Sequence, residues 1–404
     1  MSTTDRPSAG TARVRVVGIG ADGSVASPAL VAEAAVVIGA DRHLALLPSI
    51  DGQVRLPYPK PLREGLVALL SEHPGAVVLA SGDPLISGLG STLIELLGAG
   101  AVEVHPVVSS VTLARAAMGW PAESCAVVTV VGRNPAAVLR ELAPGRRIVV
   151  LSSDEHTPGT LARLLVESGY GNARMTVLGN LGTAAATRSE TSAEDYSEPA
   201  PRLNIVAIEV VGLHVGLGWT PGLPDEAYEH DGQLTKRDLR ASALARLAPT
   251  PGEHLWDVGA GAGSVGIEWM RAHPSCRTTA VEANPERAAR IARNASALGV
   301  PDLVVVNGRA PDALDGLATP DAIFIGGGAT RSGVLDACLA ALRPGGRLVV
   351  HGVTLETEAL LASAFQRYGG ELTRISVETT APVGTFTGWT PARAVTQWAY
   401  VLPR

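Results

Sequence analysis

A glycine-rich turn behind a short apolar segment constrains this chain more than any other feature. The segment His254–Val258 has the composition of a buried strand, and glycines follow it in the spacing Asp257-x-Gly259-x-Gly261-x-Gly263. Glycine is needed where a backbone turns sharply or where a ligand must approach the chain closely. The helix expected next would present free N–H groups to that ligand. The pattern therefore predicts a nucleotide-like cofactor at the end of a strand.

The glycines alone leave two enzyme classes open. The run Gly261–Gly266 fits the dinucleotide fingerprint, and so does the run Gly18–Gly23 near the start of the chain. An NAD-dependent oxidoreductase with two Rossmann domains is therefore one hypothesis. It requires both loops to hold a pyrophosphate.

Two carboxylates favour S-adenosylmethionine over NAD in the second half. Asp257 precedes the first glycine, where it would repel a pyrophosphate but attract a sulfonium or amino group, directly or through water. Glu282 ends the next predicted strand, where a carboxylate can take both ribose hydroxyls. The run Asn307–Ala310 follows the third strand, where the adenine would lie. The run Asp321–Gly328 ends in three glycines that suit a large flat substrate.

The strand candidates fall into two groups, which predicts two α/β domains at residues 13–214 and 222–404, with a boundary near residue 215. Strands alternating with helical segments favour mainly parallel sheets. The stretch Gly182–Arg202 is expected to be a loop or a hairpin, and the second half to open with a helix, Thr235–Leu247, capped by Thr235. The last two strands are expected to pair, with the final one antiparallel. The strand candidates are Val14–Gly18, Val36–Gly39, Val77–Ala80, Val102–His105, Ala126–Val131, Ile148–Ser152, Met175–Leu178 and Leu203–Val211, then His254–Val258, Thr278–Glu282, Leu303–Asn307, Ala322–Ile325, Arg347–His351, Glu371–Val377 and Thr396–Val401.

Composition disfavours several function classes. The net charge is −6, whereas a nucleic-acid binder usually carries a basic excess. Cys125, Cys276 and Cys338 lie far apart, which predicts neither a metal site nor disulfides. The polar residues Met1–Ala12 lack the apolar stretch of a signal peptide, and no apolar run is long enough to span a membrane. We therefore expect a cytoplasmic protein with no membrane partner.

The second half resembles the precorrin-6Y methyltransferase family of cobalamin (vitamin B12) biosynthesis. The resemblance is carried by Glu229–Arg237, Gly259–Gly263, Ile325–Gly328 and Val353–Glu358. It implies a Rossmann-like, seven-stranded class I methyltransferase domain that methylates C-15 and decarboxylates an acetate side chain.

The first half is similar to the tetrapyrrole methylase superfamily, and within it to the C-5 methylating partner. This similarity rests on Val17–Gly23, Gly39–Leu44, Ser81–Pro84, Val107–Val111, Gly119–Pro121 and Gly179–Gly182. It implies a two-lobed class III methyltransferase fold. Together the two halves imply a fused enzyme that methylates precorrin-6Y (or 6B) at C-5 and C-15 and releases CO2 from the C-12 acetate, giving precorrin-8X.

The resemblance also implies the cofactor-binding residues, with one S-adenosylmethionine in each domain, and a homo-oligomer. In the first half they are Gly18, Asp83, Ser109 and Ser110; in the second they are Thr235, Asp257, Gly259, Ala260, Gly261, Ala262, Gly263, Glu282 and Ala310. Some positions depart from the family pattern. They include Val131 where a histidine is frequent, Asn180 where a carboxylate is frequent, and His351-Gly352 in place of Asn-Ala.

No covalent nucleophile is needed, because an electron-rich tetrapyrrole carbon attacks the methyl group directly. A precorrin carries many carboxylates, so arginines and lysines should line its entrance. The candidates are Lys236, Arg237, Arg240, Arg309, Arg331 and Arg393. Lys236 and Arg331, together with His351 as a proton carrier, are the catalytic candidates.

Three further hypotheses remain open at this level. The substrate could contain cobalt, or the second domain could methylate RNA, although the acidic balance of the chain disfavours RNA. The first half could also be a scaffold without activity, because its motifs at Val131 and Gly179 depart from the pattern.

Overall fold

The computed structural model describes residues 13–197, 199–211 and 217–404, which form two compact units. The first unit comprises the described parts of Met1–Arg133 and Gly145–Gly212, and the second comprises Asn134–Pro144 and the described parts of Leu213–Arg404. The predicted boundary near residue 215 lies outside the described residues.

The first unit begins with a five-stranded parallel sheet in the order β3-β2-β4-β1-β5. Its core is built from fully buried strand residues such as Val16, Ile38 and Val78, packed against Leu66 and Leu93 of two helices. The strands are β1 (Val14–Ile19), β2 (Val36–Gly39), β3 (Val54–Pro57), β4 (Val77–Ser81) and β5 (Val102–His105); the helices are α1 (Pro28–Glu33), α2 (Asp41–Leu44), α3 (Leu62–Glu72) and α4 (Leu89–Leu97). Strand β3 was not predicted, because its four residues end at a proline.

The second sheet of this unit has the order β6-β7-β10-β8-β9. Only β6 and β7 are parallel, so the expectation of mainly parallel pairing was wrong here. The predicted hairpin within 182–202 is confirmed, since β9 pairs antiparallel with β8. The elements are α5 (Ser110–Met118), β6 (Cys125–Thr129), β7 (Arg147–Leu151), α6 (Thr157–Glu167), β8 (Arg174–Gly179), β9 (Thr187–Ser192) and β10 (Asn204–Glu209).

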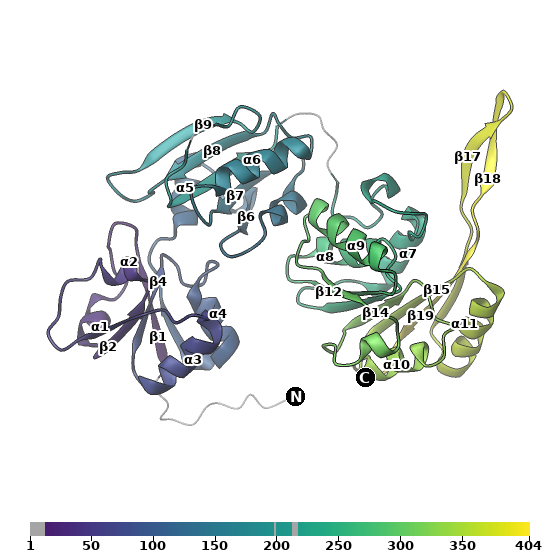
Figure 1. The fold of residues 1–404 in the computed structure, drawn as a ribbon, viewed down its shortest axis with the longest axis horizontal. Helices are drawn as coiled ribbons and strands as arrows, with labels where there is room; N and C mark the ends of the chain where they lie inside the picture. The colour runs from purple at the N-terminus through teal and green to yellow at the C-terminus, as the bar shows by residue number, and fades with distance from the viewer. Residues whose placement is uncertain (1–12, 198, 212–216) are drawn as a thin grey trace. The chain divides into compact units, whose positions relative to one another are not determined.

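The second unit is built on a seven-stranded sheet in the order β13-β12-β11-β14-β15-β19-β16 (Figure 1). The five strands from β13 to β15 are parallel, while β19 runs antiparallel to both of its neighbours, as predicted. The strands are β11 (His254–Val258), β12 (Arg277–Glu282), β13 (Val304–Asn307), β14 (Ala322–Ile325), β15 (Arg347–Gly352), β16 (Glu371–Ile375) and β19 (Val395–Val401).

Helices cover both faces of this sheet, which explains why its central strands are uniformly apolar. One face packs against α7, α8 and α9 through residues such as Leu247, Trp269 and Ile291. The other packs against α10 and α11 through Cys338 and Leu361. The helices are α7 (Arg237–Leu247), α8 (Ser264–Ala272), α9 (Pro285–Ala297), α10 (Val334–Ala341) and α11 (Leu355–Tyr368), with a 3-10 helix η3 (Pro135–Glu141) beside α9.

An antiparallel hairpin, β17 (Glu378–Val383) with β18 (Phe386–Pro391), projects from the end of this sheet (Figure 1). The sequence does not predict this hairpin, because it is exposed along most of its length and lacks the hydrophobic alternation of a half-buried strand.

Candidate active site

Three glycines of the second unit form a tight turn after β11. Gly259, Gly261 and Gly263 have φ angles of +67°, +58° and +77°, a region that side chains disfavour. A Cβ atom at Gly259 would lie 2.6 Å from the carbonyl oxygen of Gly327, and one at Gly261 would lie 2.7 Å from that of Gln233. The turn is therefore enclosed by the loop after β14 and by the segment before α7, and only glycine fits there.

Asp257 lies beneath this turn. Its side chain is buried, its Oδ2 accepts a 2.9 Å hydrogen bond from the backbone nitrogen of Gly266, and its Oδ1 has no partner in the described structure. The pKa of Asp257 is raised to about 7, chiefly by burial and in smaller part by the nearby charge of Glu282, while the hydrogen bond from Gly266 opposes both. Asp257 is not among the residues that line the adjoining cavity. Its direct contact with a ligand remains a prediction, whereas its support of the turn is visible.

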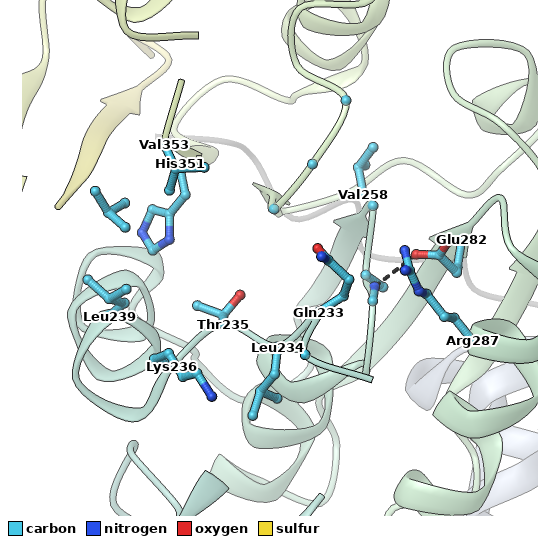
Figure 2. Close-up of a pocket in the computed structure, with 18 of the residues that line it drawn as sticks. Gln233, Leu234, Thr235, Lys236, Leu239, Val258, Glu282, Arg287, His351 and Val353 are labelled. Atoms are coloured by element: carbon cyan, nitrogen blue, oxygen red, sulfur yellow. Dashed lines mark hydrogen bonds between the residues drawn. The ribbon is translucent and has the colours of Figure 1, made fainter. Parts of the chain in front are cut away.

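Glu282 ends β12 and lines the cavity beside the turn (Figure 2). Its Oε2 accepts a hydrogen bond from the nitrogen of Gly261, and its Oε1 accepts one from the nitrogen of Asn284, each 2.9 Å long. The carboxylate is thus oriented by two backbone donors, and its remaining lone pairs are available to hydroxyl groups.

The cavity has a volume of about 1230 Å³ and opens at the carboxyl ends of β11, β12, β14 and β15. Small-molecule sites usually measure about 300–1,000 Å³, so this one has room for a cofactor and a large substrate together. Of the predicted cofactor residues, the lining includes Thr235, Gly259, Ala260, Gly261, Glu282 and Ala310. Ala262 and Gly263 are not part of it, because Ala262 is buried and Gly263 packs against Ile291.

Thr235 reaches this cavity but does not cap α7, which corrects one prediction. The helix begins at Arg237 with Lys236 as its N-cap, and no side chain accepts a capping hydrogen bond. The carbonyl oxygen of Thr235 instead accepts from the guanidinium of Arg240.

Cations surround the cavity, and most of them are unpaired. Lys236 lies 3.4 Å from Asp225. Among the described residues, no acid pairs with four other cations that line the cavity: Arg237, Arg309, Arg331 and Arg393. These exposed guanidinium groups are therefore available to the carboxylates of a ligand.

Arg240 is not one of these groups, although the sequence made it a candidate. Its side chain is fully buried, and its Nε lies 2.5 Å from Oε1 of Glu268 on α8. The same carboxylate also accepts from the backbone nitrogens of Gly222 and Leu223 and from the hydroxyl of Tyr228. Arg240 and Glu268 thus fix the segment that leads into the site, and Arg240 cannot reach a substrate.

His351 is the penultimate residue of β15 and lines the cavity on the side opposite Glu282 in Figure 2. Its Nε2 lies 2.9 Å from Oε1 of Gln397 on β19, and its ring meets that of Phe324 edge-on. Burial lowers the pKa of His351 to about 4, so the imidazole is neutral at pH 7.

The candidates of the first unit also meet at the carboxyl ends of parallel strands. Gly18 is buried at the end of β1, where a Cβ atom would lie 2.2 Å from the carbonyl oxygen of Gly82 and 2.9 Å from the nitrogen of Val107. Ser109 caps α5 by accepting a 3.0 Å hydrogen bond from the nitrogen of Thr112, and Ser110 is the first residue of that helix.

Asp83 lies in the same region, directly after Gly82. Its Oδ1 accepts a 2.9 Å hydrogen bond from the nitrogen of Leu85. A Cβ atom at Gly82 would lie 3.0 Å from the Cα of Ser109. The structure therefore brings together the turn after β1, the turn after β4 and the start of α5.

Several residues of the second site were missed by the sequence analysis. Gln233 contributes a backbone carbonyl against Gly261, and Arg287 lines the cavity while its Nε donates to Asp231 at 2.8 Å. Gln397 was missed as the partner of His351. The mostly apolar and aromatic sequence of Val395–Val401 could have singled out Gln397 as an unusual amide within a buried strand.

Two negative findings apply to the described residues. They contain no group of three or more His, Cys, Asp and Glu side chains arranged to hold a metal ion. None of their helices is both long enough and apolar enough to cross a membrane.

Known proteins match both parts of the chain. Residues 226–402 match the family described as "Precorrin methyltransferase domain", and residues 13–196 match "Tetrapyrrole (Corrin/Porphyrin) Methylases". Proteins named precorrin-6Y C(5,15)-methyltransferase [decarboxylating] from Sinorhizobium sp and Mycobacterium tuberculosis (strain ATCC 25618 / H37Rv) are each 44% identical to this chain. The alignments cover 95% of this chain in both cases, and 95% and 98% of the relatives.

A crystal structure also matches the second half. It is the C-terminal domain of the precorrin-6Y C5,15-methyltransferase of Rhodobacter capsulatus, with 42% identity and a TM-score of 0.44 over 46% of this chain and 99% of that one. With identity of 44% along nearly the whole length of two relatives, the chain belongs to the family of decarboxylating precorrin-6Y C(5,15)-methyltransferases.

Proposed function

We propose that this protein methylates precorrin-6Y (or 6B) at C-5 and C-15 with S-adenosylmethionine and releases the carboxyl group of the C-12 acetate as CO2. The product would be precorrin-8X, in cobalamin biosynthesis. The name of the two relatives supports this assignment, because the similarity spans 95% of the chain. The main structural support is the cavity of about 1230 Å³, because it is lined both by the glycine turn and by the unpaired arginines.

The two activities are assigned to different parts of the chain. Residues 13–214 would methylate C-5, and residues 222–404 would methylate C-15 and decarboxylate, with one cofactor site in each. The assignment is supported by the separate family matches at 13–196 and 226–402. It is also supported by two unrelated glycine turns, each at the carboxyl end of a parallel strand.

The residues of the second site fit S-adenosylmethionine. The turn Gly259–Gly261 leaves no room for side chains and lets a ligand approach its backbone. Glu282 offers oriented carboxylate oxygens to the ribose hydroxyls, Ala310 lies where the adenine would pack, and Thr235 borders the same space. Asp257 contributes an unpartnered, buried oxygen beneath the turn, which a positively charged ligand nearby would stabilise in its ionised form.

In the first unit, Gly18 and Gly82 leave the same kind of tight space, and Asp83, Ser109 and Ser110 border it. The free N–H groups at the start of α5 are suited to oxygen atoms of a cofactor. We therefore propose these residues as the contacts of the second cofactor molecule.

When bound, S-adenosylmethionine supplies an electrophilic methyl group. The protein's own task is to align the reacting carbon with that group and to exclude water. The unpaired guanidinium groups, including those of Arg309 and Arg331, would orient the substrate through its carboxylates. The Gly326–Gly328 loop has no side chains, so a flat macrocycle can lie close to the turn. Departure of CO2 leaves an electron pair that the conjugated macrocycle can accept.

The proposal also includes a homo-oligomer. Hairpin β17–β18 carries exposed apolar side chains, with Val383, Phe386 and Trp389 60%, 79% and 71% exposed. Contiguous exposed apolar groups mark interaction surfaces. Light scattering should give the mass of more than one chain, and Phe386→Glu should lower it; a monomeric wild-type protein would contradict this part.

Product analysis tests the proposed reaction. The purified full chain with S-adenosylmethionine and precorrin-6Y should yield a product that has gained two methyl groups and lost one CO2. Parallel reactions with the cobalt-containing substrate show which form is preferred. Formation of S-adenosylhomocysteine without this mass change would overturn the substrate assignment.

A further inference from the structure

The side chains of His351 and Gln397 form a buried polar pair in a strongly apolar part of the sheet. Gln397 is completely buried on β19, directly opposite His351 in the antiparallel pairing with β15. His351 is itself 9% exposed, and the ring lines the cavity (Figure 2). Burying an amide and an imidazole side by side is costly unless they bond to each other. Apolar packing alone does not explain why this pair is buried here.

The hydrogen bond between them fixes which ring nitrogen carries the hydrogen. The Nε2 of His351 lies 2.9 Å from Oε1 of Gln397. An amide oxygen only accepts, so Nε2 must donate. In a neutral imidazole the other nitrogen, Nδ1, then holds a lone pair. No described residue forms a hydrogen bond with Nδ1, so that lone pair has no protein partner. The residue itself lines the cavity.

The surroundings keep this imidazole neutral. Phe324 lies with its ring at 5.0 Å and 84° from the imidazole, and burial lowers the pKa of His351 to about 4. That pKa includes two smaller effects: the hydrogen bond to Gln397 raises it, and the charge of Arg246 on α7 lowers it. Arg246 is ion-paired with Glu371 of β16. The other charged groups around the cavity are Lys236, Arg237 and Asp238 on α7 or its N-cap, Arg309 and Arg331 in the loops after β13 and β14, and Arg393 before β19, with Asp225, Glu226, Glu282 and Arg287.

The proposed reaction at this site needs a proton acceptor. When the ring carbon takes the methyl group, its π electrons form the new C–C bond and the C–S bond breaks. The hydrogen already on that carbon must then leave as a proton, and the C–H electron pair returns to the conjugated ring. Separately, the carbon that loses CO2 gains one proton from water. The first of these protons needs an acceptor at the cavity.

We infer that His351 accepts this proton at Nδ1, and that Gln397 is the positioning residue that holds the ring in the accepting tautomer. The inference rests on the proposed function, because it assigns a base to that reaction. From Nδ1 the proton passes to solvent at the open mouth of the cavity. Gln397 touches no ligand and acts only through His351.

A measurement on the unreacted protein tests the tautomer. Nitrogen-15 NMR of the full chain, labelled at histidine, should show one residue with a protonated Nε2 and an unprotonated Nδ1 at pH 7. That signal should be absent from His351→Gln and should change in Gln397→Leu. A protonated Nδ1 on His351 would overturn the inference, whatever the enzyme does.

Kinetics test the role. In His351→Gln, kcat for C-15 methylation should fall about 100-fold, the scale of general base catalysis, while the affinity for S-adenosylmethionine stays the same. Gln397→Leu should lower kcat by a smaller factor. Gln397→Glu should move the acid limb of the rate profile to higher pH, because a carboxylate raises the pKa of His351 and only its neutral form accepts. Unchanged kcat in His351→Gln, or an unmoved acid limb in Gln397→Glu, would overturn the inference.

His254 provides a matched control. It lies at the amino end of β11, half-buried, with its Nε2 2.9 Å from the hydroxyl of Thr279. His254→Gln should leave kcat and its pH profile unchanged. A wild-type chain that forms no C-15-methylated product would refute the proposed function itself. A productive wild type with a fully active His351→Gln would refute only the role of His351.

Discussion

The carboxylate of Asp257 accepts a hydrogen bond from the backbone nitrogen of Gly266 across the glycine turn that separates them in the sequence. One residue thereby links the end of β11 to the first turn of α8, and the cavity wall formed by Gly259–Gly261 lies between these two anchors. The acidic residue before the first glycine is therefore part of the framework of the proposed cofactor site.

This carboxylate predicts a pH-dependent stability. The pKa of Asp257 is about 7 in the folded chain and near 4 in an unfolded one. Between these values the unfolded state releases a proton that the folded state retains, so rising pH destabilises the fold. The free energy of unfolding of Asp257→Asn, relative to wild type, should therefore rise from pH 4 to pH 7, by up to about 4 kcal/mol, and level off above.

Urea unfolding at several pH values measures this difference. The buried, unpartnered amide of Asp257→Asn lowers the free energy of unfolding by the same amount at every pH. It therefore does not affect how the difference from wild type changes with pH. Asp302→Asn, at an exposed position, controls for the loss of a surface charge. A relative stability of Asp257→Asn that stays flat from pH 4 to pH 7 would show that Asp257 is ionised throughout.

The variant Gly18→Ala, which adds only a Cβ atom to the chain, should lose C-5 methylation. The new Cβ atom would lie 2.2 Å from the carbonyl oxygen of Gly82, which is backbone and cannot move aside cheaply. Gly159→Ala is the matched control, because its nearest neighbour would be the ring of Tyr196 at 3.7 Å. Mass spectrometry of the product of Gly18→Ala should show methylation at C-15 but not at C-5. Full C-5 methylation by this variant would contradict the assignment of that reaction to the first unit.

The unpaired arginines should set the affinity for the substrate. A charge-assisted hydrogen bond contributes about 1.5–3 kcal/mol when shielded and less at an exposed site. Arg309→Gln and Arg331→Gln should each raise KM for the precorrin about three- to tenfold, with little change in kcat. The effect should shrink at high salt.

Arg367→Gln is the control for the loss of one positive charge, because Arg367 lies on α11 over the ring of Tyr368 and does not line the cavity. Equal KM values for all three variants at low salt would show that Arg309 and Arg331 do not bind the substrate.

The buried pair of Arg240 and Glu268 should be essential to stability. Arg240→Ala leaves the Glu268 carboxylate buried without its main counter-charge, which costs about 3–5 kcal/mol. Arg293→Ala removes an exposed ion pair with Glu229 and should cost less than about 1 kcal/mol. Chemical denaturation measures the free energy of unfolding of both variants. A similar decrease in the two would mean that the buried Glu268 carboxylate does not depend on Arg240.

The sequence predicted the sheet of the second unit well, because long apolar strands alternate there with amphipathic helices. It also placed Glu282 and Ala310 at the carboxyl ends of parallel strands, and both line the cavity, because such strand ends converge. The contact between Gln233 and Gly261 could not be predicted, because it is made by a backbone carbonyl and no side chain marks it.

Residue type alone also misled at Arg240. An arginine four residues after Lys236 looks available for a substrate, and only the fold brings Glu268 against it. In the first unit, the second sheet is mostly antiparallel, since β8, β9 and β10 are joined without the crossover helices that parallel pairing needs.

The most direct test of two methylation sites on one chain is the product formed by Gly261→Val. At this position a side chain would meet the carbonyl oxygen of Gln233 at 2.7 Å in a backbone conformation with φ of +58°. Mass spectrometry of its product from precorrin-6Y should show one added methyl group, at C-5, with the carboxyl group of the C-12 acetate retained. A product with both methyl groups and without that carboxyl group would contradict the assignment of C-15 methylation and decarboxylation to this site.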